Sequence, residues 1–388
     1  MAAARDAAEP GYQKMKQFKV KRQLGKGAFG DVYLVQRKSD GKEYALKKVA
    51  IGSMQEREVL DALNEIRFLA SVRHPNVIGF LEAFLNERKL ELCVVMEYAD
   101  GGDLAEKVEA HTKSRRYMNE TQIWVYFLQI IEGLQSLHDK KILHRDLKSA
   151  NCFLTRDGKL KIGDLNVSKL AKAGLVKTQI GTPYYMSPEI WHNRPYDAKS
   201  DIWAAGCILY ELAALRPPFR GVDLEDLSRR VQAGYYPRIP SSYSMELDHV
   251  IKSCLQQSPA RRPTASELLA MPAVVKWKAQ VKASLDGTLI TKLGNMEAPD
   301  MLATIQVPRN LKRLTNALPE ACYPDSRPDS PKHWPVAAEG RQGRLLAAVG
   351  EGDEEDEATT SGKSHPHAGK PPRAAAASVA ETRLSDPS

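Results

Sequence analysis

The segment H-R-D-L-K-S-A-N, residues 144–151, carries the strongest signal in this sequence of 388 residues. Asp164 follows thirteen residues after Asn151, within the segment K-I-G-D-L-N. Carboxylate and amide oxygens are the hard ligands that magnesium prefers. A single aspartate on a polar loop is usually a turn former. The order and spacing of these residues together indicate instead a possible base and two possible metal ligands on two neighbouring loops.

These two segments together resemble the catalytic core of a eukaryotic protein kinase, which transfers the γ-phosphate of ATP to a hydroxyl group. The resemblance implies that Asp146 orients the substrate hydroxyl as the catalytic base and that Lys148 neutralises charge on the transferred group. It also implies that Asn151 and Asp164 hold Mg²⁺. ATP and Mg²⁺ are therefore the expected cofactors.

The sequence between Asp164 and Glu189 ends in G-T-P-Y-Y-M-S-P-E, which resembles the end of the kinase segment that controls activity. The resemblance implies a buried ion pair between Glu189 and Arg262, the second arginine of R-R-P-T. It places Thr182 near the catalytic aspartate. Together with Lys148, Thr182 is typical of kinases that act on serine and threonine of protein substrates.

Thr178 is a candidate phosphorylation site four residues before Thr182. A phosphate there would add about −1.5 to −2 charge, and Arg145, directly before the catalytic aspartate, is a suitable partner that would order the segment. We expect an upstream kinase or the protein itself to modify Thr178. An unmodified loop threonine is the alternative.

One residue departs from the kinase pattern. The chain has Asp164, Leu165 and Asn166 where kinases have Asp-Phe-Gly or Asp-Leu-Gly. Glycine lets the backbone rotate between active and inactive arrangements, and asparagine tolerates a left-handed conformation best after glycine. Asn166 therefore bears on switching more than on catalysis. It is also the only sequence argument for an alternative function, a pseudokinase scaffold that binds nucleotide without turnover.

A glycine-rich segment near the N-terminus, G-K-G-A-F-G, follows a predicted strand that begins at Phe18. A single G-x-G-x-x-G is weak evidence, because it also opens dinucleotide-binding folds. There the glycines lead into a helix, whereas here D-V-Y-L-V-Q continues as a second strand and predicts a hairpin. The kinase resemblance then assigns nucleotide binding to Leu24, Gly25, Lys26, Gly27, Ala28, Phe29, Gly30, Asp31, Val32, Ala45, Lys47, Glu97 and Ala99.

Lys47 lies on a third predicted strand, E-Y-A-L-K-K-V-A. An unpaired ammonium on a buried strand is costly, so we expect a partner, and Glu65 on the predicted helix of residues 55–71 provides one. In the kinase resemblance Lys47 holds the α- and β-phosphates and Glu65 holds Lys47. The alternative is that Glu65 is one of several solvated helix charges.

Two strand-like runs, V-I-G-F-L-E-A-F and L-E-L-C-V-V-M-E, lead to residues 97–99, which the resemblance identifies as the hinge that binds adenine. Met96 would then lie at the back of the nucleotide pocket, or serve as simple core packing. After Asp103 the pattern becomes helical. Asn119 can cap a helix that runs to about residue 138 and carries one apolar face. Short strands are expected at residues 152–154 and 160–162, and further helices at residues 200–215, 223–233, 245–255, 265–269 and 274–284.

Composition is that of an ordinary globular protein, with 43% apolar and 27% charged residues. No apolar run approaches the roughly 20 residues that span a bilayer, and the first ten residues lack the apolar core of a signal peptide. We therefore expect no membrane partner and a cytoplasmic protein. The cysteines form no close pairs, which is typical of reduced structural thiols.

The formal net charge of +8 raises the question of nucleic acid as a partner. The Lys and Arg residues are scattered, with only short clusters such as residues 113–116, and no zinc-finger, homeodomain or RNP pattern occurs. We expect no nucleic-acid partner. No heptads are visible, so the sequence predicts no coiled coil and leaves the oligomeric state open.

The resemblance extends over residues 18–269 and implies an α+β, bilobal protein-kinase fold: a small β-sheet lobe with one main helix, residues 18–98, and a larger helical lobe, residues 103–270. Residues 1–17 are expected to form a flexible leader and residues 271–388 a largely disordered tail. Within kinases, G-T-P-Y-Y-M-S-P-E, M-E-Y-A-D-G-G-D-L and L-K-K-V resemble the NIMA-related (Nek) group. That group implies roles at microtubules, centrosomes or cilia and in the cell cycle. A kinase of small molecules is a further alternative, disfavoured by residues 182–189.

Overall fold

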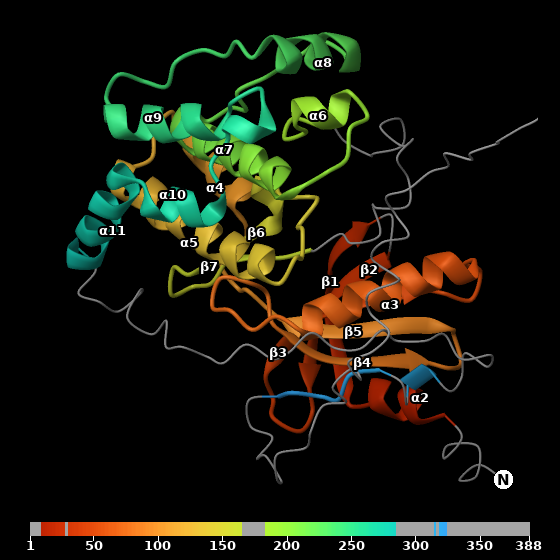
Figure 1. Cartoon of the computed structure of the whole chain (residues 1–388). Coiled ribbons are helices and arrows are strands. Elements are labelled where there is room, and N and C mark those ends of the chain that lie inside the picture. The colour runs from red at the N-terminus through yellow and green to blue at the C-terminus, as the bar shows by residue number, and fades with distance from the viewer. Residues whose placement is uncertain (1–8, 28–29, 165–182, 285–313, 316–317, 324–388) are drawn as a thin grey trace, which may run out of the picture. The chain divides into compact units, whose positions relative to one another are not determined.

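The computed structural model describes residues 9–27, 30–164, 183–284, 314–315 and 318–323 (Figure 1). They form an antiparallel sheet with helix α3 (Glu56–Ala70) beside it, followed by a mainly helical part. The predicted α+β class and the division into a smaller sheet lobe and a larger helical lobe are confirmed. No helix among these residues is long and apolar enough to cross a membrane.

The smaller lobe is a sheet of five strands in the order β1-β2-β3-β5-β4. Alternate side chains of each strand point to opposite faces, so each face builds its own core. Val49, Ala83 and Leu85 contribute to the core on the α3 face, and Leu46 and Phe84 to the core on the other. The strands are β1 (Phe18–Gly27), β2 (Gly30–Arg37), β3 (Glu43–Ala50), β4 (Phe80–Asn86) and β5 (Glu91–Glu97).

Helix α3 (Glu56–Ala70) covers one face of this sheet. Gln55 caps its N-terminus in a capping box, where the Gln55 N–H donates to the Glu58 carboxylate at 3.0 Å. Val59, Leu63, Ile66 and Leu69 recur at helical spacing and are buried. The burial of this stripe against the sheet fixes the rotation of α3 about its own axis, and therefore the direction in which its other side chains point.

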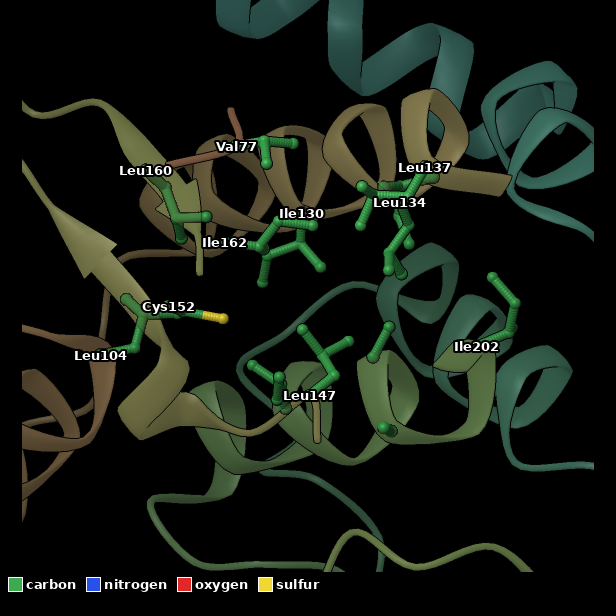
Figure 2. Close-up of a cluster of buried hydrophobic side chains, with 14 of the residues drawn as sticks. Val77, Leu104, Ile130, Leu134, Leu137, Leu147, Cys152, Leu160, Ile162 and Ile202 are labelled. Atoms are coloured by element: carbon green, nitrogen blue, oxygen red, sulfur yellow. The ribbon is translucent and has the colours of Figure 1, made fainter. Parts of the chain in front are cut away.

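The larger lobe is organised around α5 (Glu120–Asp139), which begins at the predicted cap: Asn119 accepts a hydrogen bond from the Thr121 N–H at 2.9 Å. Figure 2 shows Ile130, Leu134 and Leu137 of α5 in one buried cluster with residues of the neighbouring elements. Around it lie α4 (Leu104–Ser114), β6 (Cys152–Leu154), β7 (Leu160–Ile162), α6 (Pro188–Trp191), α7 (Ala198–Ala214), α8 (Leu224–Ala233), α9 (Met245–Cys254) and α10 (Ala265–Ala270).

The two lobes are joined by backbone hydrogen bonds on β7. The Ile78 N–H donates to the Ile162 carbonyl at 2.9 Å, and the Ile162 N–H donates to the Asn76 carbonyl at 2.9 Å. The residues before β4 are therefore fixed to the strand that leads to Asp164.

The structure differs from the sequence predictions at both ends of the kinase-like region. Pro10–Met15, predicted to belong to a flexible leader, form helix α2, which packs on β4. The helix predicted at residues 274–284 is present as α11 (Pro272–Ser284), and Trp277 stacks on Trp124 of α5 at 5.4 Å. The larger lobe thus continues past residue 270. Most of the predicted disordered tail lies outside the described residues, but residues 314–323 include parts that pack on the smaller lobe.

All five cysteines are free thiols. Cys93, Cys152, Cys207 and Cys254 are buried, and burial raises the pKa of Cys93 and of Cys254 to about 12. Thiols with such a raised pKa carry almost no reactive thiolate at neutral pH. This agrees with the prediction of structural, reduced cysteines.

Candidate active site

Asp201, near the start of α7, holds the backbone of residues 144–151, which we call the catalytic segment. Its buried carboxylate accepts hydrogen bonds from the N–H groups of His144 and Arg145 at 3.0 and 3.1 Å. The same carboxylate lies 2.8 Å from His138 Nε2 and accepts a hydrogen bond from the Tyr196 hydroxyl. Burial works to raise the pKa of Asp201, but these partners outweigh burial and lower the pKa. Asp201 is therefore an ionised anchor for the loop backbone.

Two side chains fix the carboxylate of Asp146. Asn151 Nδ2 donates to the Asp146 carbonyl at 2.7 Å and to Asp146 Oδ2 at 3.2 Å. Lys148 Nζ lies 3.0 Å from the same Oδ2. The segment thus folds back on itself, and the three residues singled out from H-R-D-L-K-S-A-N meet at one carboxylate.

Lys47 forms the predicted ion pair. Its Nζ donates to Glu65 Oε1 at 2.8 Å and lies 3.4 Å from Asp164 Oδ1. Burial works to lower the pKa of Lys47, but the two carboxylates outweigh it and raise the pKa. The alternative that Glu65 is a solvated helix charge is wrong, because its side chain is largely buried against Lys47.

Asn151 and Asp164, the predicted metal ligands, lie on adjoining loops. Gly163, directly before Asp164, donates its N–H to the Asn151 carbonyl at 2.9 Å. Because Asn151 Nδ2 serves Asp146, the amide oxygen is the atom left for a cation, and the Asp164 carboxylate is 46% exposed. Within the described residues no group of three or more His, Cys, Asp and Glu could hold a metal. Two oxygen donors suit Mg²⁺, which keeps its other positions for phosphates and water.

The glycine-rich segment forms the predicted hairpin between β1 and β2. Gly25, Lys26 and Gly27 lie opposite Val32, Asp31 and Gly30. Gly30 has φ 138°, and a Cβ there would lie 2.1 Å from the Lys48 carbonyl oxygen, so only glycine fits. Leu24 also lies on β1. Ala28 and Phe29, at the tip, lie outside the described residues.

The predicted hinge follows β5. Ala45 on β3 lies opposite Met96, the residue directly before Glu97. The Glu97 N–H donates to the Gly79 carbonyl at 2.9 Å, and Glu97 Oε2 lies 3.0 Å from Lys161 Nζ of β7. This side-chain contact, which the sequence did not suggest, fastens the hinge to the larger lobe. Ala99 lies two residues beyond β5.

The ion pair predicted from S-P-E and R-R-P-T is present. Arg262 Nη1 and Nη2 each donate to a different carboxylate oxygen of Glu189, both at 2.7 Å. Both side chains are buried, and Ser200 also donates to Glu189 at 2.6 Å. Arg262 Nη1 also donates to the Lys199 carbonyl of α7 at 3.0 Å, so Arg262 ties the end of the segment predicted to control activity to α7.

Tyr185 is a site residue that the sequence analysis missed. Its hydroxyl donates to Glu211 Oε2 at 2.7 Å and lies 2.8 Å from Ser149 Oγ of the catalytic segment. Burial, together with Glu211, raises the pKa of Tyr185, so the hydroxyl stays protonated. His138 and Tyr196, which hold Asp201, were missed as well. No local pattern distinguishes these three residues, and the partners of Tyr185 and His138 are distant in sequence.

Several predictions concern residues outside the described part of the chain. They are the nucleotide-binding roles of Ala28 and Phe29, the roles of Thr178 and Thr182 and the effect of Asn166 on switching. The pairing of Arg145 with a phosphate at Thr178 is therefore not tested by these contacts and stays a prediction.

The sequence pattern of the family described as Protein kinase domain matches residues 18–274. The chain is 38% identical over 259 residues to probable serine/threonine-protein kinase nek2 of Dictyostelium discoideum, covering 66% of this chain and 62% of that protein. It is 39% identical over 255 residues to serine/threonine-protein kinase Nek4 of Mus musculus, covering 65% and 32%. It is 36% identical over 314 residues to serine/threonine-protein kinase Nek3 of Mus musculus, covering 79% and 59%. The chain thus spans less than two thirds of each relative.

Proposed function

The chain belongs to the protein kinase family, and from this premise we propose that it transfers the γ-phosphate of ATP to serine or threonine hydroxyls of protein substrates. The arrangement of Asp146, Lys148 and Asn151 carries the proposal. A carboxylate held by a lysine and an amide, together with a second lysine paired with Glu65, is suited to phosphoryl transfer, in which most catalysis is positioning and charge neutralisation.

In the proposed reaction Asp146 accepts the hydrogen bond of the substrate hydroxyl and directs its oxygen at the phosphate. Lys148, 3.0 Å from Asp146 Oδ2, neutralises charge on the group in transfer. Lys47, kept cationic by Glu65, binds the α- and β-phosphates. Asn151 and Asp164 would hold Mg²⁺, which would supply charge neutralisation for the phosphates.

Serine and threonine are the proposed acceptors because Lys148 follows Asp146 at the spacing typical of kinases of that class. The names of the relatives agree, since each is called a serine/threonine-protein kinase. Similarity to Nek proteins further supports a proposed cytoplasmic role in the cell cycle, at microtubules, centrosomes or cilia. Phosphorylation of Thr178, by the protein itself or by another kinase, is part of the same proposal.

The pseudokinase alternative is weakened by the charged residues. Lys47, Glu65, Asp146, Asn151 and Asp164 are all present and in contact as described above. A scaffold without turnover has no need of this full set.

The acceptor class can be tested with two matched peptide libraries, one with serine and threonine acceptors and one with tyrosine. Full-length protein, Mg²⁺ and ATP are supplied to both. We expect phosphate on serine and threonine only. Phosphate on tyrosine would overturn the proposed acceptor class, and nucleotide binding with no transfer to either library would favour the scaffold.

A further inference from the structure

Two carboxylates are buried in the smaller lobe at β4. Glu82, within the strand, is 5% exposed, and Glu87, just after it, is 3% exposed. A buried carboxylate requires hydrogen-bond or ionic partners, because leaving water without them is costly. The identity of these partners shows which parts of the chain the lobe needs.

The partners of Glu82 come from outside residues 18–274, which match the kinase family. Lys14 Nζ of α2 lies 2.6 Å from Glu82 Oε1, and the Tyr323 hydroxyl donates to Glu82 Oε2 at 3.0 Å. Burial raises the pKa of Tyr323, so its hydroxyl stays a donor. One buried carboxylate of the kinase region therefore binds a segment that precedes this region in the sequence and another that follows it.

Glu87 is bound in the same way by the first turn of α2. The N–H groups of Gly11 and Tyr12 donate to its two carboxylate oxygens at 2.9 and 2.8 Å. These are orphan donors at a helix N-terminus, where a carboxylate is the natural acceptor. A Cβ at Gly11 would lie 1.7 Å from the Leu85 carbonyl oxygen, so α2 approaches β4 at backbone distance.

Residues 314–315 and 318–323, which we call the strap, also bind the backbone of β4, a strand at the edge of the sheet. The Cys322 N–H donates to the Leu81 carbonyl at 2.7 Å, at a register shift where Leu81 has no partner on β5. Farther along, the Leu85 N–H donates to Thr315 Oγ1 at 3.1 Å. The strap thus runs antiparallel to β4 and satisfies backbone groups that an open edge exposes.

Apolar side chains of the strap enter both cores of the smaller lobe. Leu314 and Leu318 are buried in the core that includes α3, whereas Tyr323 is buried in the core on the opposite face. The Tyr323 ring packs edge-on against Tyr44 at 5.4 Å and lies under the Arg37 guanidinium at 3.5 Å. Figure 1 shows the described parts of the strap in blue beside β4 and α2. The strap therefore wraps around the edge of the sheet.

We propose that the strap is an intramolecular element that completes the smaller lobe, with Glu82 joining it to α2, and that it keeps β4 and α3 in the arrangement that pairs Glu65 with Lys47. Because α3 packs on β4, loosening one element loosens the other. The folded unit then extends beyond the family region at both ends. This inference goes beyond the proposed activity and holds whether or not the protein transfers phosphate.

Hydrogen exchange of the full-length protein, followed by mass spectrometry without nucleotide, tests the strap. Leu318→Asp places a charge in the buried contact, and Ala321→Asp adds the same charge at an exposed position of the same segment. We expect Leu318→Asp to speed exchange in residues 56–70 and 80–86 by about tenfold or more, with Ala321→Asp unchanged. Unaltered exchange in α9 would show that the larger lobe is still folded.

A gentler variant guards against general misfolding. Tyr323→Phe keeps the ring and removes only the hydroxyl that binds Glu82, and we expect about fivefold faster exchange in residues 80–86. The proposal is overturned if Leu318→Asp exchanges like the wild type in β4 and α3, or if Ala321→Asp has the same effect as Leu318→Asp. Since no nucleotide is present, failure of the kinase proposal would not produce either outcome.

Discussion

Lys47 on β3 donates a hydrogen bond to Glu65 on α3 at 2.8 Å, and this contact joins the sheet of the smaller lobe to its helix. The strand register puts Lys47 opposite Val94, on the face that α3 covers. The position of the ammonium that is proposed to bind phosphates therefore depends on the packing of α3.

Replacing Lys47 with methionine should reduce phosphate transfer by about 100-fold to 1,000-fold, because one preorganised charge at the phosphates is lost. Lys48→Met is a matched control, since Lys48 is adjacent in sequence but lies over the Tyr33 ring at 4.8 Å. Initial rates with saturating Mg²⁺ and ATP measure both variants. Equal rates for Lys47→Met and the wild type would contradict the assigned role.

Arg262→Ala should lower the free energy of unfolding by about 3–5 kcal/mol, since it leaves the buried carboxylate of Glu189 without its ionic partner. Arg229 also pairs with a carboxylate, that of Asp226, but its side chain is 76% exposed. Arg229→Ala should therefore have little effect. Urea denaturation measures both variants, and similar losses in the two would contradict the distinction between buried and exposed pairs.

Stability should decline in acid through Glu189. Burial works to raise its pKa, but the hydrogen bonds from Arg262 and Ser200 outweigh burial and lower it. A carboxyl group with a lowered pKa in the folded state stabilises the protein fully above its ordinary pKa of about 4.3, and this contribution is lost as pH falls.

We therefore expect the difference in unfolding free energy between wild type and Glu189→Gln to shrink as pH falls below about 4.5. Urea denaturation from about pH 7 to about pH 3 measures it. A difference that stays constant over this range would show that the Glu189 carboxylate contributes nothing through its charge.

Gly30→Ala should destabilise the protein by about 1–3 kcal/mol, because alanine at φ 138° is strained and its Cβ meets the Lys48 carbonyl. Gly25→Ala is the control, since a Cβ at Gly25 has no atom within 4 Å. Thermal unfolding without nucleotide separates this effect from phosphate binding. Equal melting temperatures for the two variants would contradict the steric argument.

Much of the fold follows from local patterns. The hairpin at Gly27 and Gly30, the helix cap at Asn119 and the short strands β6 and β7 were all predicted, because turn chemistry, capping and apolar periodicity act over a few residues. The pairs of Lys47 with Glu65 and of Arg262 with Glu189 came from ordered motifs at long separation, which a family resemblance supplies.

Contacts without such a motif could not be predicted. The hydroxyl of Tyr185 reaches Glu211 only because the fold brings the residues before α6 against α7, and neither residue stands out in the sequence. The packing of α2 and of the strap could not be predicted either. Their short runs of apolar and polar residues are compatible with a flexible segment, and only the structure shows their contacts with Glu82 and the edge of β4. Both sets of contacts join residues that are far apart in the sequence and that meet only in the folded chain.

The most direct measurement compares incorporation of labelled phosphate into a generic serine- and threonine-containing protein by the wild type and by Asp146→Asn. Both proteins are first shown to be folded and to bind ATP with equal affinity. Asparagine has nearly the same size and shape as aspartate, so it fits the space that Asp146 occupies beside Asn151 and Lys148. We predict that the variant loses about 100-fold to 10,000-fold in transfer rate. Transfer by Asp146→Asn at the rate of the wild type would contradict the account.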